Sequence, residues 1–128
     1  MANTLGNPTL VSDKARENNV LSYNSTLTSA PTVANPILRI RNSTTTLVDF
    51  PLDATTPFTG GDVDGVATFN FSAATAVATG GTATIPNNYQ VLGRDNAVHL
   101  SGTVTATDGI SVGQTVAAGS ITATSPAS

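Results

Sequence analysis

The stretch ILRIRNSTTTLVDFPL, residues 37–52, contains two strand-like runs joined by a turn. In the first run apolar and charged side chains alternate, which is the period of two expected for a half-buried β-strand. The Asn-Ser-Thr sequence at 42–44 is typical of a turn. In the second run Pro51 indicates a sheet edge or a strand end, because proline cannot donate to a ladder. The apolar residues that share one face of this second run are Val48, Phe50 and Leu52.

Further short runs of this kind continue to residue 124, with turn residues between them. They cover residues 66–72, 79–85, 89–92, 98–104, 110–112 and 116–124. Gly93–Asn96 is typical of a hairpin connection. No helical periodicity occurs within residues 37–124, which excludes a doubly wound α/β fold. We therefore expect an all-β fold, an antiparallel β-sandwich or jelly-roll-like barrel of about seven or eight short strands. Its expected core anchors are Phe50, Phe69 and Phe71.

The first 34 residues differ from the rest because their apolar residues are sparse. Ser12 is a good N-cap, so a short helical turn could follow it, and Asn18-Asn19 would end that turn. We predict an extended N-terminal arm over residues 1–34, followed by a β-sandwich domain over residues 35–128. A disordered terminus remains open as an alternative for the same segment.

Charged residues make up only 10% of the chain and the net charge is −3, whereas a typical protein carries about 25% charged residues. After Arg41 the only basic residue is Arg94. A surface that binds nucleic acid or an anionic membrane needs clustered Lys and Arg, so neither partner is expected. There is no cysteine, and no stretch approaches the roughly 20 apolar residues of a membrane span. The start resembles no secretory signal, so we expect assembly in a cytosol, and the three Asn-X-Ser/Thr matches at Asn24, Asn42 and Asn70 are interpreted as chance.

Residues with catalytic or metal-binding chemistry are few. His99, the one histidine, lies between apolar residues of an alternating run and is best explained as a polar side chain on a strand face. Asp62-Val63-Asp64-Gly65 resembles the start of a calcium loop, but the ligand positions that should follow hold Val66 and Ala73. Gly80-Gly81 lacks the lysine and the following helix of a phosphate loop. We therefore expect no catalytic residue, no cofactor and no metal site.

The aromatic residues outside the expected core are few. Phe58 follows a proline in a loop and could either contact a partner or pack down as a plug; packing is the favoured interpretation. A carbohydrate-binding module would need an exposed aromatic platform. The residues available for one are Tyr23, Phe58 and Tyr89.

Residues 37–123 resemble a group of small tailed-phage virion proteins. The matching pieces are Leu38-Arg39-Ile40, Leu47–Leu52, Pro57-Phe58, Gly65–Phe69, Tyr89–Leu92, Val98–Val104 and Gly113–Val116. The resemblance lies in the order and spacing of these pieces and not in any one of them. It implies a β-sandwich virion component, a capsid decoration or cement protein that binds the outer surface of the assembled head and stabilises it, with no catalytic residue to carry over.

The resemblance also implies the partners. They would be the major capsid protein and further copies of this chain, in a homotrimer on the capsid surface of the virion. Low charge agrees with this, because it limits repulsion between copies packed closely together. Two alternatives stay open: a tail or baseplate adaptor or fibre-associated protein of the same fold, and a carbohydrate-binding module.

Overall fold

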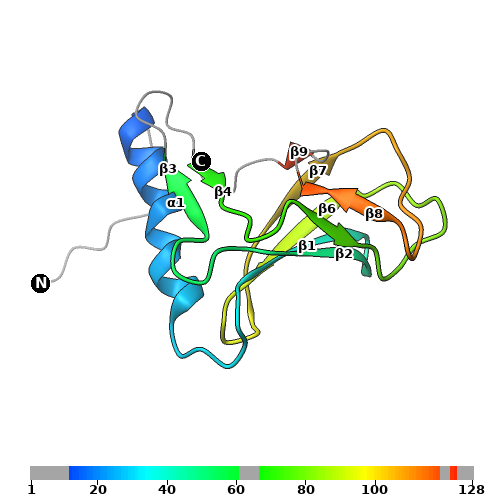
Figure 1. Ribbon diagram of the computed structural model, residues 1–128. Helices are drawn as coiled ribbons and strands as arrows, with labels where there is room; N and C mark the ends of the chain where they lie inside the picture. The colour runs from blue at the N-terminus through cyan, green and yellow to red at the C-terminus, as the bar shows by residue number, and fades with distance from the viewer. Residues whose placement is uncertain (1–11, 61–66, 119–121, 124–128) are drawn as a thin grey trace, which may run out of the picture.

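The computed structural model describes residues 12–60, 67–118 and 122–123 and contains one helix and nine strands in these ranges (Figure 1). A five-stranded antiparallel sheet has the order β2-β1-β6-β7-β9, and two separate pairs are β3-β4 and β5-β8. The predicted all-β, antiparallel, sandwich-like fold is confirmed. The elements are α1 (Asp13–Thr28), β1 (Ile37–Asn42), β2 (Thr45–Pro51), β3 (Phe58–Gly60), β4 (Ala67–Phe69), β5 (Thr75–Val77), β6 (Asn88–Leu92), β7 (Val98–Thr105), β8 (Thr115–Ala117) and β9 (Thr122–Ala123).

β1 is an inner strand of the main sheet, between β2 and β6, and its alternating residues line the core. Leu38 lies opposite Phe50 on β2 and opposite Val91 on β6, and Ile40 lies opposite Tyr89. All five side chains are almost fully buried. The period-two pattern therefore works as expected: one face of the sheet makes the core and the other faces solvent.

The edge of the main sheet at β2 is covered by the chain itself. The Leu47 carbonyl accepts a hydrogen bond from Thr79 N at 2.8 Å, and the Pro51 carbonyl accepts one from Ser72 N at 2.9 Å. The chain from residue 72 to residue 80 thus runs along this edge and carries β5, which pairs with β8 to form a small second layer. The prediction that Pro51 marks an edge strand is confirmed, and no open ladder remains at these two carbonyls.

The aromatic residues pack around the contact between the two layers and the helix. Phe50, Phe58 and Tyr89 are at most 2% exposed. Phe69 and Phe71 are half-buried, with ring centroids 6.0 Å apart. Phe50 is thus the core anchor that was expected, whereas Phe69 and Phe71 pack against the core from its side. The interpretation of Phe58 as a packed plug is confirmed, and its ring centroid lies 5.0 Å from that of Phe69.

The N-terminal segment departs from the expected extended arm. Ser12 is the N-cap, with its Oγ accepting from Ala15 N at 3.1 Å, as its residue type suggested. The helix does not end at Asn18-Asn19; it continues to Thr28. The prediction of an extended arm is therefore wrong for residues 13–28, and its part over residues 1–11 lies outside the described residues.

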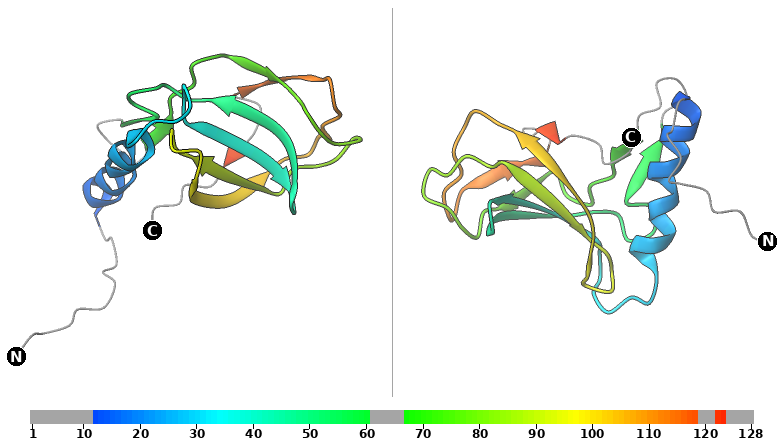
Figure 2. Two further views of the ribbon diagram at one scale, coloured as in Figure 1. Left: turned by 90° about the horizontal axis from the view of Figure 1, so that it is seen from below. Right: turned by 180° about the vertical axis from the view of Figure 1, so that it is seen from behind.

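Helix α1 belongs to the same core as the sheet. Val20 and Leu27 are at most 1% exposed and lie in one cluster with the residues of β1 and β2. The Asn24 side chain accepts from Phe58 N at 2.8 Å and donates to Phe58 O at 2.9 Å, which attaches the helix to β3. Gly60 of β3 also faces the helix, because a Cβ built there would meet the side-chain ends of Glu17 and Leu21. Figure 2 shows α1 beside β3 at one end of the sandwich in both views.

The C-terminal strands also differ from the expectation. The single strand predicted over residues 116–124 is two short strands in different sheets, because β8 pairs with β5 and β9 pairs with β7. The run at 79–85 forms only an isolated bridge between Thr84 and Ile110. Asp62–Gly65, the calcium-like sequence, lies outside the described residues. In the described part α1 is neither long nor apolar enough to cross a membrane.

Candidate interaction surface

His99 takes part in closing the β6–β7 hairpin. Its Nε2 lies 2.8 Å from Asp95 Oδ2, and Asp95 Oδ1 accepts a hydrogen bond from Ala97 N at 3.1 Å. The Ala97 N–H, and then the His99 ring, lower the pKa of the Asp95 carboxyl below its usual value. Asp95, the partner of the His99 ring, thus comes from the same hairpin, and the predicted hairpin at Gly93–Asn96 is confirmed. The pair holds the turn together and gives His99 a structural explanation.

The same hairpin also holds the segment between α1 and β1. The Arg94 N–H donates to Leu27 O at 2.7 Å, and the Arg94 carbonyl accepts from Val33 N at 2.9 Å. The guanidinium reaches back to Val33 O at 3.3 Å and to Ala54 O at 3.4 Å. Arg94 therefore joins the end of the helix to the sheet, and its guanidinium forms hydrogen bonds to backbone carbonyls of the same chain.

The remaining sequence motifs also have structural partners. Asn24 is bound to β3 as described above, Asn42 Nδ2 donates to Ile85 O at 2.6 Å, and Asn70 Nδ2 donates to Thr56 O at 2.9 Å. The amide of each Asn-X-Ser/Thr match is thus engaged. Within the described residues no group of three or more His, Asp or Glu side chains could hold a metal ion.

The three aromatic residues considered for carbohydrate binding do not form a platform. Tyr89 and Phe58 are 0% and 2% exposed, so neither ring can stack on a sugar. Burial also raises the pKa of Tyr89 to about 12. Tyr23 is half-buried and its hydroxyl accepts from Asn19 Nδ2. These positions give no support to the carbohydrate-binding alternative.

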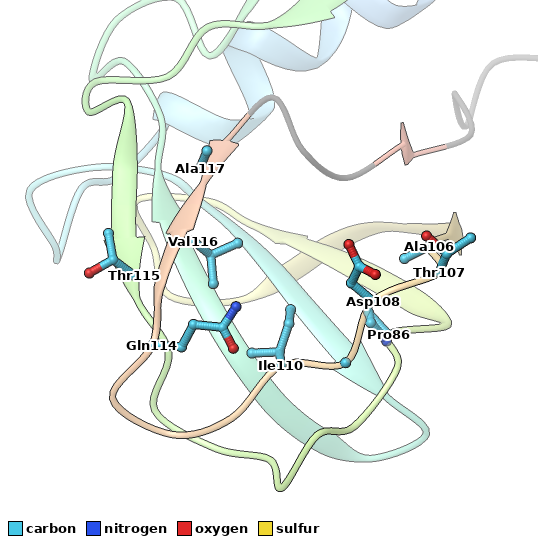
Figure 3. Close-up of a pocket in the computed structure, with 10 residues that line it drawn as sticks. Pro86, Ala106, Thr107, Asp108, Ile110, Gln114, Thr115, Val116 and Ala117 are labelled. Atoms are coloured by element: carbon cyan, nitrogen blue, oxygen red, sulfur yellow. The ribbon is translucent and has the colours of Figure 1, made fainter.

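An open groove of about 290 Å³ lies between β8 and the segment that follows β7. Ile110 and Val116, both about 95% buried, form its floor, and Figure 3 shows their side chains in the space between these two segments. Asp108 is the one ionisable residue of the lining. The Gln114 amide oxygen is engaged with Ser111 N at 3.0 Å. The full lining is Pro86, Ala106, Thr107, Asp108, Gly109, Ile110, Gln114, Thr115, Val116 and Ala117.

Of the four strongly exposed large apolar side chains in the described residues, two lie at one end of the sandwich and a third borders that end. We call this the distal end; it consists of residues 42–45, 78–87 and 106–114, which lie at the opposite end from α1 (Figures 1 and 2). Asp108 is its one ionisable residue. Of the four large hydrophobic residues that are strongly exposed in the described part, Ile85 and Val112 lie in it and Val77 borders it, at 49%, 65% and 59% exposure, whereas Val98 lies elsewhere.

The segments that carry these valines are bonded to each other. Val112 N donates to Gly81 O at 3.1 Å, and Gly113 N donates to Ala78 O at 2.8 Å, next to Val77. This hydrogen-bonded frame displays apolar side chains with almost no charge around them, which suits contact with another protein. Sequence reasoning missed it, because exposure depends on pairing between residues more than 30 positions apart.

Comparison with known proteins found no match to this chain among protein-family models, curated proteins or solved structures.

Proposed function

We propose that this chain is a structural protein of a tailed-phage virion, a capsid decoration (cement) protein that binds the major capsid protein on the outer surface of the assembled head. The observation that carries the proposal is the nearly uncharged distal end, in which Ile85 and Val112 are exposed and at whose border Val77 is exposed. Residues 37–123 supply the second support through their resemblance to virion proteins of this kind.

Attachment by such a surface would stabilise the shell by mass action. A protein that binds the assembled shell but not its separated subunits shifts the equilibrium toward assembly. Each contact can be weak, because many copies act together at high effective concentration. A low charge lets neighbouring copies approach one another without strong repulsion.

The N-terminal arm takes a smaller part in this proposal than the sequence indicated. Residues 13–28 form a helix whose Val20 and Leu27 are in the core, so they are not free to lie across neighbouring subunits. Residues 1–11 of the predicted arm lie outside the described residues. Deleting residues 1–34 would remove part of the core, so an arm deletion should stop before the N-cap Ser12.

The test compares two matched valine substitutions in the full chain. Val112→Asp places a charge in the distal end, and Val98→Asp places the same charge at a similarly exposed valine outside it. Both proteins are mixed with shells assembled from the major capsid protein of the same genome and are sedimented. Burying a valine contributes about 1.5 kcal/mol, so Val112→Asp should weaken binding about tenfold or more.

Val98→Asp should bind as the unchanged protein does, and both variants should melt at the temperature of the unchanged protein. Equal binding by the unchanged protein and Val112→Asp would overturn the distal end as the docking surface. A protein that binds tails but not shells would identify the tail or baseplate alternative instead.

A further inference from the structure

The groove beside β8 has two walls that the rest of the fold holds in place. The β8 wall is fixed at its start, where the Gln114 carbonyl accepts a hydrogen bond from Ala78 N at 2.8 Å. The facing wall, residues 106–110, is fixed by Ile110 and Thr84, which exchange two backbone hydrogen bonds of 2.8 and 3.0 Å. Because both walls are formed before anything binds, little ordering opposes the entry of a ligand.

The carboxylate of Asp108 is the charged group of this groove. Its residue is exposed, and it forms no hydrogen bond or ion pair with any described residue. Figure 3 shows Asp108 on one side of the groove and Gln114 on the other, with Ile110 between them. The aspartates whose carboxylates do have partners in the fold are Asp49, Asp53 and Asp95.

The chain itself supplies no cation to Asp108. Every Lys, Arg and His side chain belongs to a described residue, and none of them contacts Asp108. No Lys, Arg or His follows His99 in the sequence, so the residues after β8 carry no basic side chain that could pair with it. A cationic side chain that pairs with Asp108 therefore belongs to another molecule.

The rest of the groove favours an apolar group and a hydrogen-bond acceptor. Ile110 and Val116 form its floor, and water over an apolar floor is favourably displaced by an apolar side chain. The Gln114 amide oxygen accepts from Ser111 N at 3.0 Å, whereas its NH₂ group donates to no described residue. This NH₂ group can donate to a carbonyl of the bound segment.

We propose that the groove binds a segment of the partner protein in which an aliphatic side chain lies beside a lysine or arginine. The aliphatic side chain rests on Ile110 and Val116, and the basic group pairs with Asp108. Val112, four residues farther along the same frame, extends the apolar contact. That the partner is the major capsid protein rests on the proposed function, whereas the chemistry of the bound segment rests on the groove.

A peptide titration tests the groove without a shell. The probes are acetyl-Leu-Lys-Leu-amide and two matched controls, in which glutamate replaces the lysine or serines replace both leucines. We expect the first peptide to shift the backbone amide NMR signals of Asp108, Gln114 and Val116 in a saturable way at millimolar concentration. The controls should bind about fivefold more weakly or less, since each lacks one of the two contacts.

Two variants at Asp108 separate its charge from its shape. Asp108→Asn should remove the preference for the lysine peptide over the glutamate peptide, and Asp108→Glu should retain it. Both variants should melt at the temperature of the unchanged protein, because the side chain is exposed and has no partner in the described fold. In sedimentation with shells, raising NaCl from about 0.05 to about 0.5 M should weaken the unchanged protein more than Asp108→Asn.

The outcomes distinguish this proposal from the proposed function. Equal binding of the three peptides, no binding of any, or a lysine preference that survives Asp108→Asn would each overturn the groove as the site, even if shells still bind. Binding of the lysine peptide at Asp108 by a protein that binds no shell would support the groove and count against the capsid assignment. Self-association that Asp108→Asn abolishes would give the cation to a second copy and overturn the assignment to a different protein.

Discussion

Asn24 gives the most direct test of how the helix is attached to the sandwich. Its side-chain amide bonds both the N–H and the C=O of Phe58, at 2.8 and 2.9 Å, and Phe58 is 2% exposed. Asn24→Ala removes both bonds and leaves two backbone groups of β3 without partners. Each unpaired group costs about 1–3 kcal/mol when buried. Because Asn24 is only half-buried, water should relieve part of this cost, and the expected loss of unfolding free energy is about 2–4 kcal/mol.

The assay is thermal and urea unfolding followed by circular dichroism. In a domain of this size 1 kcal/mol corresponds to roughly 3–5 °C, so Asn24→Ala should melt about 6–20 °C lower. Ser25→Ala, one position along on the exposed side of the same helix, should change the unfolding free energy by less than about 0.5 kcal/mol. Equal stability of the two variants would refute the docking of α1 on β3.

Three further predictions concern the sheet and its loops. Gly102→Ala should destabilise the fold by about 1–3 kcal/mol in urea unfolding, because its Cβ would lie 2.5 Å from the Tyr89 ring; wild-type stability would contradict this packing. Arg94→Met should lose about 1–3 kcal/mol in the same assay, since it leaves carbonyls of the helix–sheet connection without a charged donor. Carboxyl titration by NMR should find Asp53 with a pKa of about 2, lowered chiefly by the Thr56 and then the Thr55 backbone N–H. Because this folded value lies below the unfolded value of about 3.9, the stabilisation is present above that value and is lost as the pH falls toward 2.

The main sheet could be predicted from the sequence because its signals are local. Three signals depend only on nearby residues, and the structure agrees with each of them. They are the alternation of apolar and charged residues in β1, the turn residues at 42–44 and Pro51. The prediction that Phe58 packs down is also correct, since a lone aromatic residue after a proline tends to do so. These features need no knowledge of distant pairing.

The helix shows where local reasoning failed. The prediction of Ser12 as the N-cap is correct, but the prediction that Asn18-Asn19 end the helix, which follows from the weak helix propensity of asparagine, is wrong. The packing of Val20 and Leu27 and the bonds from Asn24 to Phe58, 34 residues away, outweigh that preference. No pattern in the neighbouring sequence predicts a contact between residues so far apart.

The groove beside Val116 and the pairing of β8 and β9 could not be predicted from the sequence either. The groove lies beside Val116 of β8, which pairs with β5, and within the described residues β9 pairs with two residues of β7. The sequence pattern of residues 116–124 predicted one continuous strand. Which sheet each part joins depends on contacts across the whole chain.

An electron-microscopy map of the intact particle tests the central proposal most directly. We predict density for this fold at many positions over the outer surface of the head, with the distal end around Val112 turned toward the shell. Density for it in the tail alone, or no density in the particle, would contradict the assignment as a capsid decoration protein.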